Sequence, residues 1–190
     1  MSNNIFLNPN PKIYHFIPWD SSKNIGLSYN NFMELLSDDD WGCFLDGDAI
    51  HTTTFFGKRI EDIIHNNPDF NLLTCYTNRV ACAYQIPNNV SWVSNDMLYH
   101  RDIGEKLWNQ NKINVQNITN ENLLSGVLIL IRKSEWSKVG GFSENGMLGV
   151  DNNIHLKFRS AGFKVGLMKG IYVQHWYRGG DKNNTKHLIR

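Results

Sequence analysis

The stretch DDDWGCFLDGDAIH, residues 38–51, indicates both how this chain folds and where it binds. Its apolar run, WGCFL, is short and aromatic, which is typical of a buried β-strand. Two carboxylates, Asp46 and Asp48, follow this run at once and are separated by Gly47. In open α/β sheets, ligands bind beyond the carboxyl ends of the strands, and a glycine lets the backbone turn sharply there. The stretch therefore predicts a rigid strand that holds two carboxylates at a ligand-binding edge.

Two neighbouring carboxylates repel each other unless a cation lies between them. Oxygen ligands of this kind suit Mg²⁺ or Mn²⁺, ions that commonly bridge to diphosphate oxygens. We therefore expect a divalent-metal site at Asp46 and Asp48. A plain turn is the alternative, because Asp and Gly are frequent turn residues. An EF-hand-like calcium loop fits less well, since no Glu stands at its twelfth position and a strand, not a helix, leads into it.

Charge and composition narrow the class of protein. The chain has 190 residues with 19 basic and 18 acidic side chains, so its net charge of +1 gives no long-range attraction to nucleic acid or anionic membranes. We expect no nucleic-acid partner, no integral membrane segment and no signal peptide. The odd count of cysteines, Cys43, Cys75 and Cys82, suits a reducing compartment and three buried small side chains. These features predict a cytoplasmic protein.

Hydrophobic periodicity divides the chain into alternating strands and helices. We expect one α/β domain over residues 1–190, with a mainly parallel sheet flanked by helices. The long polar segment 85–122 is predicted to be irregular, and such segments are usually functional or mobile. The predicted strands are 12–19, 41–45, 71–81, the start of 126–142, and 166–176, and the predicted helices are 24–37, 53–68, the middle of 126–142, and 149–162.

Further motifs follow the Asp-Gly-Asp turn in a fixed order. A hydrophobic strand and a short helix end in Gly-Gly-Phe, an acidic helix start and a basic pair come next, and the last strand ends in a histidine. In this order the motifs resemble the GT-A fold glycosyltransferases, particularly the large inverting-type family that includes chitin, cellulose and O-antigen sugar transferases. The resemblance covers roughly residues 12–178, and the matching residues are Gly140, Gly141, Phe142, Asp151, Lys157, Arg159, Ala161, Gly162 and His175.

The resemblance implies transfer of a sugar from a nucleotide-diphosphate sugar, with a UDP-sugar favoured, to a hydroxyl of a glycan or another acceptor. It implies that Asp48 binds Mn²⁺ or Mg²⁺ directly. Asp46 would contact the ribose of the donor, or the ion through water, and His175 would be a further metal ligand or phosphate contact. A plain edge-strand histidine is the alternative for His175. The tail, about 177–190, is expected to be flexible and to close over the donor, with Arg178 neutralising phosphate charge.

Inverting transfer also needs a general base for the proton of the acceptor hydroxyl. The resemblance gives this role to Asp151, near a predicted helix N-terminus, where the helix dipole favours the ionised form. A simple N-cap is the alternative for Asp151. Val150 stands where the family often has Glu, and Asn153 replaces a second acidic residue, so retention of anomeric configuration stays open. The segment 92–108 lies where acceptors bind in this family.

The N-terminal part is shorter than in these transferases, since only 45 residues precede Asp46. Its stretch FIPWDSSKNIG, residues 16–26, would supply part of a pocket for the nucleotide base. Trp19 is a candidate stacking surface and Asp20 a candidate polar contact, while ordinary packing is the alternative for Trp19. The shortening also leaves open a non-catalytic carbohydrate- or nucleotide-binding module of the same fold. A pyrophosphorylase-type nucleotidyltransferase fits less well, because it would need a glycine-rich basic loop after the first strand.

Overall fold

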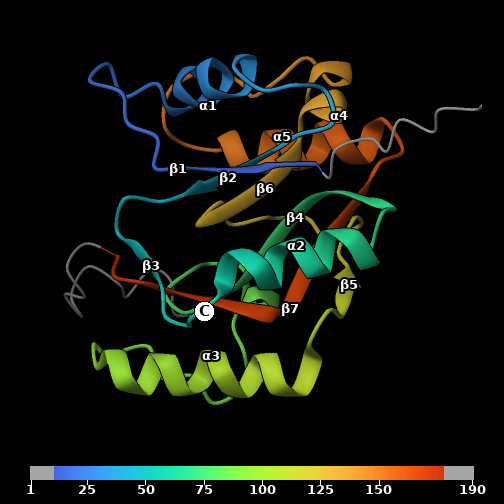
Figure 1. The fold of residues 1–190 in the computed structure, drawn as a ribbon. Coiled ribbons are helices and arrows are strands. Elements are labelled where there is room, and N and C mark those ends of the chain that lie inside the picture. Colours follow the sequence, from blue (N-terminus) through green and yellow to red (C-terminus); the bar gives the residue numbers. More distant parts are fainter. Residues whose placement is uncertain (1–10, 178–190) are drawn as a thin grey trace, which may run out of the picture.

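A mixed, open seven-stranded sheet forms the centre of the structure, a computed structural model that describes residues 11–177. The main path of the sheet runs β1-β2-β6-β4-β7-β3, and β5 pairs with β7 beside it. Every strand therefore belongs to one hydrogen-bonded layer (Figure 1). The strands are β1 Ile13–Phe16, β2 Trp41–Leu45, β3 Ala49–His51, β4 Phe70–Thr77, β5 Val115–Asn117, β6 Leu128–Arg132 and β7 Lys164–His175.

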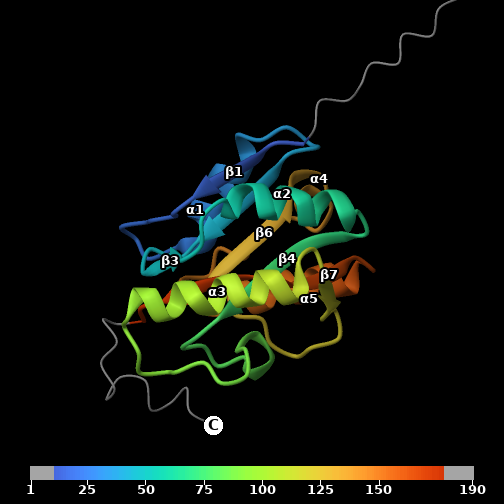
Figure 2. The same cartoon turned by 60° about the horizontal axis from the view of Figure 1, so that its bottom comes forward.

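Helices cover both faces of this sheet. Figure 1 shows α1, α4 and α5 together above the sheet, and Figure 2 shows α2 and α3 side by side across its other face. Two clusters of buried apolar side chains match this arrangement: Met33 of α1 and Phe158 of α5 belong to one, and Ile60 of α2 to the other. The helices are α1 Ile25–Glu34, α2 Phe56–Asn66, α3 Met97–Asn111, α4 Lys133–Lys138 and α5 Val150–Ser160, with a 3₁₀ turn, η1, at Ala83–Gln85.

The strand predicted from WGCFL is β2, with the predicted bounds of Trp41–Leu45. Its first four residues are buried because strands lie on both sides of it and helices on both faces. β1 pairs with it in parallel and β6 in antiparallel orientation. The prediction of a buried strand in front of the carboxylates is confirmed.

The expectation of a mainly parallel sheet is wrong. Of the six strand pairings, only β1 with β2 and β4 with β7 are parallel, while the other four are antiparallel. The main difference is β6, which lies antiparallel between β2 and β4. The connection from β4 to β6 contains α3 and β5 and returns the chain to the edge where β4 ends. Even so, β1, β2, β4 and β7 run in one direction, so their carboxyl ends share one edge.

The expectation that residues 85–122 are irregular is also wrong, because this segment holds the 15-residue helix α3. The side chain of Asp96 caps its N-terminus by accepting a hydrogen bond from the Leu98 N–H at 2.9 Å. The fully buried residues of α3 are His100 and Gly104, so the helix shows no apolar stripe in the sequence. A Cβ atom at Gly104 would lie 2.5 Å from Cγ2 of Thr53, which shows how closely the helix approaches the chain beneath it.

The remaining sequence predictions of elements are confirmed within a few residues. α1, α2 and α5 form where periodicity places them, and α5 ends before Gly162, whose φ of +78° suits glycine. Cys43, Cys75 and Cys82 are free and buried, as expected. In residues 11–177, no helix has the length and apolar character needed to cross a bilayer.

Candidate metal centre

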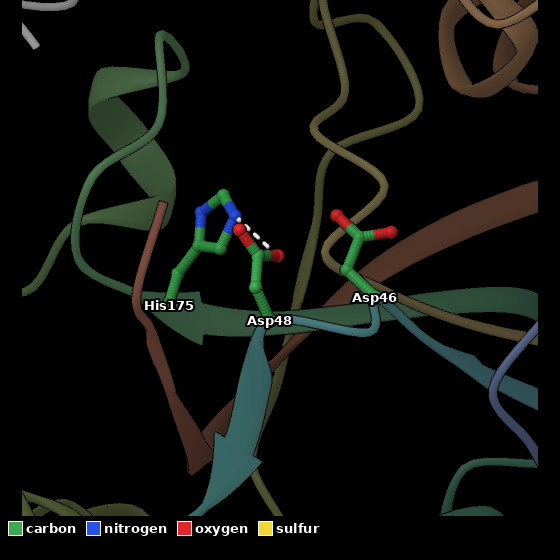
Figure 3. Close-up of side chains that lie close together, drawn as sticks. All are labelled: Asp46, Asp48 and His175. Carbon is green, nitrogen blue, oxygen red and sulfur yellow. Dashed lines mark ion pairs between the residues drawn. The ribbon is translucent and has the colours of Figure 1, made fainter. Parts of the chain in front are cut away.

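Asp46, Asp48 and His175 come together at the edge where the parallel-running strands end. One ligand atom from each residue lies within 4.8 Å of the other two. His175 is buried, Asp46 is half-buried and Asp48 is exposed. Figure 3 shows the three side chains on the same side of the chain, with His175 and Asp48 facing each other and Asp46 beside them. The structure therefore brings together the three residues that the sequence predicts as metal ligands.

The backbone fixes the two carboxylates by a short turn between β2 and β3. The N–H of Ala49 donates to the carbonyl of Asp46 at 3.0 Å, closing the turn, and the N–H of Asp46 donates to Val127 at 3.0 Å. An added Cβ at Gly47 would lie 3.7 Å from Ile17, just after β1. Ala49 pairs with His175 across β3 and β7. This pairing explains why residues more than a hundred positions apart meet here.

Hydrogen bonds to Asn78 and Arg79 orient His175 and its imidazole. Its Nδ1 lies 3.2 Å from the carbonyl oxygen of Arg79, and its backbone N–H donates to Oδ1 of Asn78 at 2.7 Å. Because a carbonyl can only accept, Nδ1 carries the proton and Nε2 faces the carboxylate. Nε2 lies 3.3 Å from Oδ1 of Asp48. A lone pair and a carboxylate oxygen at this separation need a proton or a metal cation between them.

The donor set fits a small divalent ion. Ligands of an octahedral ion at about 2.1 Å lie about 3 Å apart when adjacent and about 4.2 Å apart when opposite. The three donor atoms, within 4.8 Å of one another, therefore need only small side-chain rotations to share one ion. Two carboxylates suit Mg²⁺ and Mn²⁺, and an imidazole as the third ligand favours Mn²⁺. The hydrogen bond from Nδ1–H of His175 to the Arg79 carbonyl is also typical of a metal-binding histidine, whose second ring nitrogen usually donates to a carbonyl or carboxylate.

The electrostatics of Asp46 disfavour its ionised form. Its pKa is raised from 3.8 to about 6: burial is the largest cause, the charge of His175 opposes the shift, and the nearby Asp48 and Asp151 add to it. A bound cation would reverse this effect by stabilising the ionised form. The centre therefore has the excess of negative charge that a divalent ion would neutralise.

Asp151, the predicted general base, lies near this centre but outside it. Oδ2 of Asp151 accepts the N–H of Gly126 at 2.9 Å and Oδ1 accepts that of Asn152 at 2.8 Å. Burial raises its pKa, and these backbone N–H groups oppose the shift. The N-cap of α5 is Gly149, so the alternative that Asp151 is the cap is wrong. Its carboxylate instead joins the start of α5 to the segment before β6.

A buried tyrosine lies close to both acidic positions. Tyr29 of α1 is 4% exposed, and its ring stacks on Phe44 with the centroids 4.6 Å apart. Burial raises its pKa, and the charges of Asp46 and Asp151 raise it further. The phenol of Tyr29 therefore stays protonated and keeps an O–H donor near these two carboxylates.

The residues predicted to bind the nucleotide differ in their surroundings. Trp19 is 78% exposed, so ordinary packing is wrong, and it follows β1 at the same sheet edge as Asp46. The carboxylate of Asp20 accepts hydrogen bonds from the N–H and the hydroxyl of Ser22 at 2.7 and 2.8 Å, which places it in a local turn. Arg178 and nearly all of the predicted tail lie outside the described residues.

A hollow of about 630 Å³ lies away from the metal centre, between β1 and α2. Charged side chains of both signs line it, among them Lys12, Lys58 and Asp62. Lys58 and Asp62 already form an ion pair at 3.0 Å. None of the predicted site residues lines this hollow, so it is no part of the candidate centre.

Sequence reasoning missed Asn78 and Arg79, which hold His175 in place. Both residues follow directly after β4, in the motif TNR, and both are buried. Their position was the available signal, because β4 ends at the same sheet edge as β2 and β7. Polar residues at the end of a buried strand would have marked them for the site.

Comparisons with known proteins found no match that could assign a function to this site. The chain matches no family model and no curated protein. A functional conclusion therefore depends on the arrangement of Asp46, Asp48 and His175, together with the order of motifs in the sequence.

Proposed function

We propose that this protein is a metal-dependent glycosyltransferase that moves a sugar from a nucleotide-diphosphate sugar, with UDP-sugars favoured, to an acceptor hydroxyl on a glycan. One observation carries the proposal: Asp46, Asp48 and His175 converge within 4.8 Å at the carboxyl edge of the sheet. Such an edge is where ligands bind in open α/β sheets. The mixed sheet between two helical layers supports the proposal at the level of architecture.

Each residue of the centre has a defined task in this proposal. Asp48 and His175, which face each other, would hold Mn²⁺ or Mg²⁺, and Asp46 would complete the set of ligands or contact the ribose. When bound, the ion stabilises the charge that develops on the departing diphosphate, as a Lewis acid does. The Arg79 carbonyl keeps the Nδ1 proton in place, so that Nε2 remains directed at the ion.

Asp151 is the proposed general base. Burial raises its pKa, and a carboxylate with a raised pKa accepts a proton more readily at neutral pH. Both of its oxygens accept one backbone N–H and each keeps a further lone pair for the acceptor hydroxyl. Tyr29, whose pKa is raised by burial and further by the charges of Asp46 and Asp151, keeps its phenol protonated nearby.

The donor nucleotide would lie at the end of β1. Trp19 presents its exposed ring there, and an exposed indole offers a stacking face for a base. The acceptor would lie near the segment 92–95, because the Arg79 guanidinium ties the carbonyls of Trp92 and Ser94 to those of His175 and Trp176. The two substrates would then meet across the metal centre.

A screen of nucleotide sugars for Mn²⁺-dependent hydrolysis or transfer tests the proposal. We expect turnover of at least one donor, lost on chelation and in Asp48→Ala. Asp69→Ala is the matched control, because Asp69 is an exposed acid next to the start of β4, at the opposite sheet edge, and pairs with Lys164 at 2.8 Å. Absence of turnover with every donor and divalent ion would contradict the proposal.

A second candidate is a non-catalytic nucleotide- or carbohydrate-binding module of the same fold. The observation that favours it is the use of both Asp151 oxygens to hold backbone N–H groups, as a purely structural carboxylate would. Calorimetry with UDP and UDP-sugars separates the two candidates. A module binds its ligand without turnover, and Asp151→Asn leaves its affinity unchanged, whereas the transferase loses turnover in Asp151→Asn while it still binds the donor.

A further inference from the structure

Arg79 is a fully buried cation beside the candidate metal centre. Its side chain is 1% exposed, directly after β4. All five guanidinium N–H groups have an acceptor, which uses the full donor capacity of the group. The acceptors are the carbonyls of Trp92 at 2.7 Å, His175 at 3.2 Å, Trp176 at 3.0 Å and Ser94 at 2.9 Å, and Oδ1 of Asn95 at 2.6 Å.

These five acceptors are neutral, which is unusual for a buried arginine. The ion pairs within residues 11–177 do not include Arg79. Burying a charge without a counter-charge opposes folding, and burial accordingly lowers the pKa of Arg79. A lysine has three donors and no planar fork, so it could not hold the same set of carbonyls. This arrangement is costly for stability alone and therefore points to a positional task.

Arg79 and its neighbour hold the metal ligand His175 from several sides. The guanidinium binds the His175 carbonyl, the Arg79 carbonyl accepts the proton of Nδ1, and Asn78 accepts the His175 backbone N–H. The backbone donor, the backbone acceptor and the ring of His175 are thus all held by two consecutive residues. The direction of Nε2 toward Asp48 depends on this set of bonds.

The same guanidinium holds the segment in front of α3. It binds the carbonyls of Trp92 and Ser94, and the Ser94 carbonyl also accepts a hydrogen bond from Nε2 of His100 at 2.9 Å. Nδ1 of His100 in turn lies 2.7 Å from the hydroxyl of Tyr172 in β7. The segment 92–95 and the end of β7 therefore form one hydrogen-bonded unit, with Arg79 at its centre.

We propose that Arg79 is a positioning residue of the metal centre. Its backbone and guanidinium fix the ring direction of His175, and its guanidinium joins the segment 92–95 to the edge where the ion binds. The part of this inference that concerns the ion rests on the proposed function, while the part that concerns the histidine ring does not. The five N–H groups of the guanidinium are all used by acceptors other than Asp46 and Asp48, so Arg79 acts on the centre through His175.

Two measurements on Arg79→Lys test the inference. Mn²⁺ affinity, from calorimetry or electron paramagnetic resonance, should fall by about 10- to 100-fold, as when an outer contact of a metal ligand is lost. The substitution keeps the Arg79 carbonyl but removes the guanidinium bonds to the His175 and Trp176 carbonyls, which hold that carbonyl beside Nδ1. Nitrogen-15 NMR of the metal-free protein should show that His175 loses its single Nδ1–H form. Arg59→Lys is the control, because Arg59 is also mostly buried but pairs with Glu105 at 2.8 Å and lies over the ring of Trp108. It should leave both measurements as in the wild type.

The outcomes separate the inference from the proposed function. Wild-type protein that binds no Mn²⁺ would overturn the proposed metal centre, while the NMR measurement would still decide the role of Arg79. Unchanged affinity together with an unchanged His175 spectrum in Arg79→Lys would overturn the inference and leave the metal centre standing. If Arg79→Lys does not fold, Asn95→Ala decides, because it removes one acceptor from the guanidinium and leaves Arg79 in place. A change in the His175 spectrum of Asn95→Ala supports the inference, and a wild-type spectrum overturns it.

Discussion

Asp46→Asn should stabilise the metal-free protein, although Asp46 belongs to the candidate centre. The folded protein holds this carboxyl at a pKa of about 6, against 3.8 without the fold. Between these two values the folded state binds the proton more tightly than the unfolded state does. The contribution of this group to stability is therefore full below about pH 3.8, falls as the pH rises through about 6, and stays at its lower value above that. Asparagine resembles the protonated form in shape and carries no charge at any pH.

The magnitude follows from the size of the shift. About two pKa units, at about 1.4 kcal/mol each, give an upper limit of about 3 kcal/mol at pH 7.5. Because Asp46 is only half-buried, we expect about 1 to 3 kcal/mol of added unfolding free energy in the variant. At pH 4 most of the difference disappears, since the wild-type carboxyl is then largely protonated in the folded state.

Urea unfolding at pH 4 and 7.5, in the presence of a chelator, measures this difference. The same experiment with saturating Mn²⁺ should reverse the order at pH 7.5. An ion at 100 times its dissociation constant stabilises the wild type by about 2.7 kcal/mol, and the variant loses much of that gain. A variant that is less stable than the wild type in chelator at pH 7.5, or equally stabilised at both pH values, would refute the reasoning about charge.

Three further predictions concern a close approach, a candidate stacking residue and the candidate base. Gly104→Ala should lower the unfolding free energy by about 1 to 3 kcal/mol in urea titrations, because its Cβ would lie 2.5 Å from Thr53. Trp19→Ala should leave the unfolding free energy within about 0.5 kcal/mol, since the ring is 78% exposed, but it should weaken UDP binding in calorimetry. Asp151→Asn should reduce turnover by about 100-fold or more while Mn²⁺ affinity stays within threefold; unchanged turnover would remove Asp151 as the base.

The strand β2 and the turn after it were predictable because both depend on residues next to each other. A short apolar run defines the strand, and the spacing of Asp46 and Asp48 around Gly47 defines the turn. His175 was predictable only through the order of motifs that resembles a known family. The reason it meets Asp48 is the antiparallel pairing of β3 with β7, and β3, only three residues long, carries too little pattern to be recognised.

The direction of β6 and the helix α3 could not be predicted for a related reason. Alternating strands and helices look the same in the sequence whether a connection crosses the sheet or returns to its starting edge. In α3 the fully buried residues are His100 and Gly104, so no apolar stripe marks the helix. Its place is set by tertiary contacts, namely the bond of His100 to Tyr172 and the close approach at Gly104.

Two side chains of opposite charge whose burial opposes folding, Asp46 and Arg79, lie near His175, and this arrangement links stability to binding. Burial raises the pKa of Asp46 and lowers that of Arg79, so each group opposes folding in its charged form. They do not form an ion pair with each other, because four carbonyls and the Asn95 amide oxygen use all the N–H groups of the Arg79 guanidinium. A sheet edge selected for stability alone would hold apolar residues at both positions. The cost is explained if the Asp46 charge is matched by an ion and the Arg79 charge keeps the ligand that binds the ion in place.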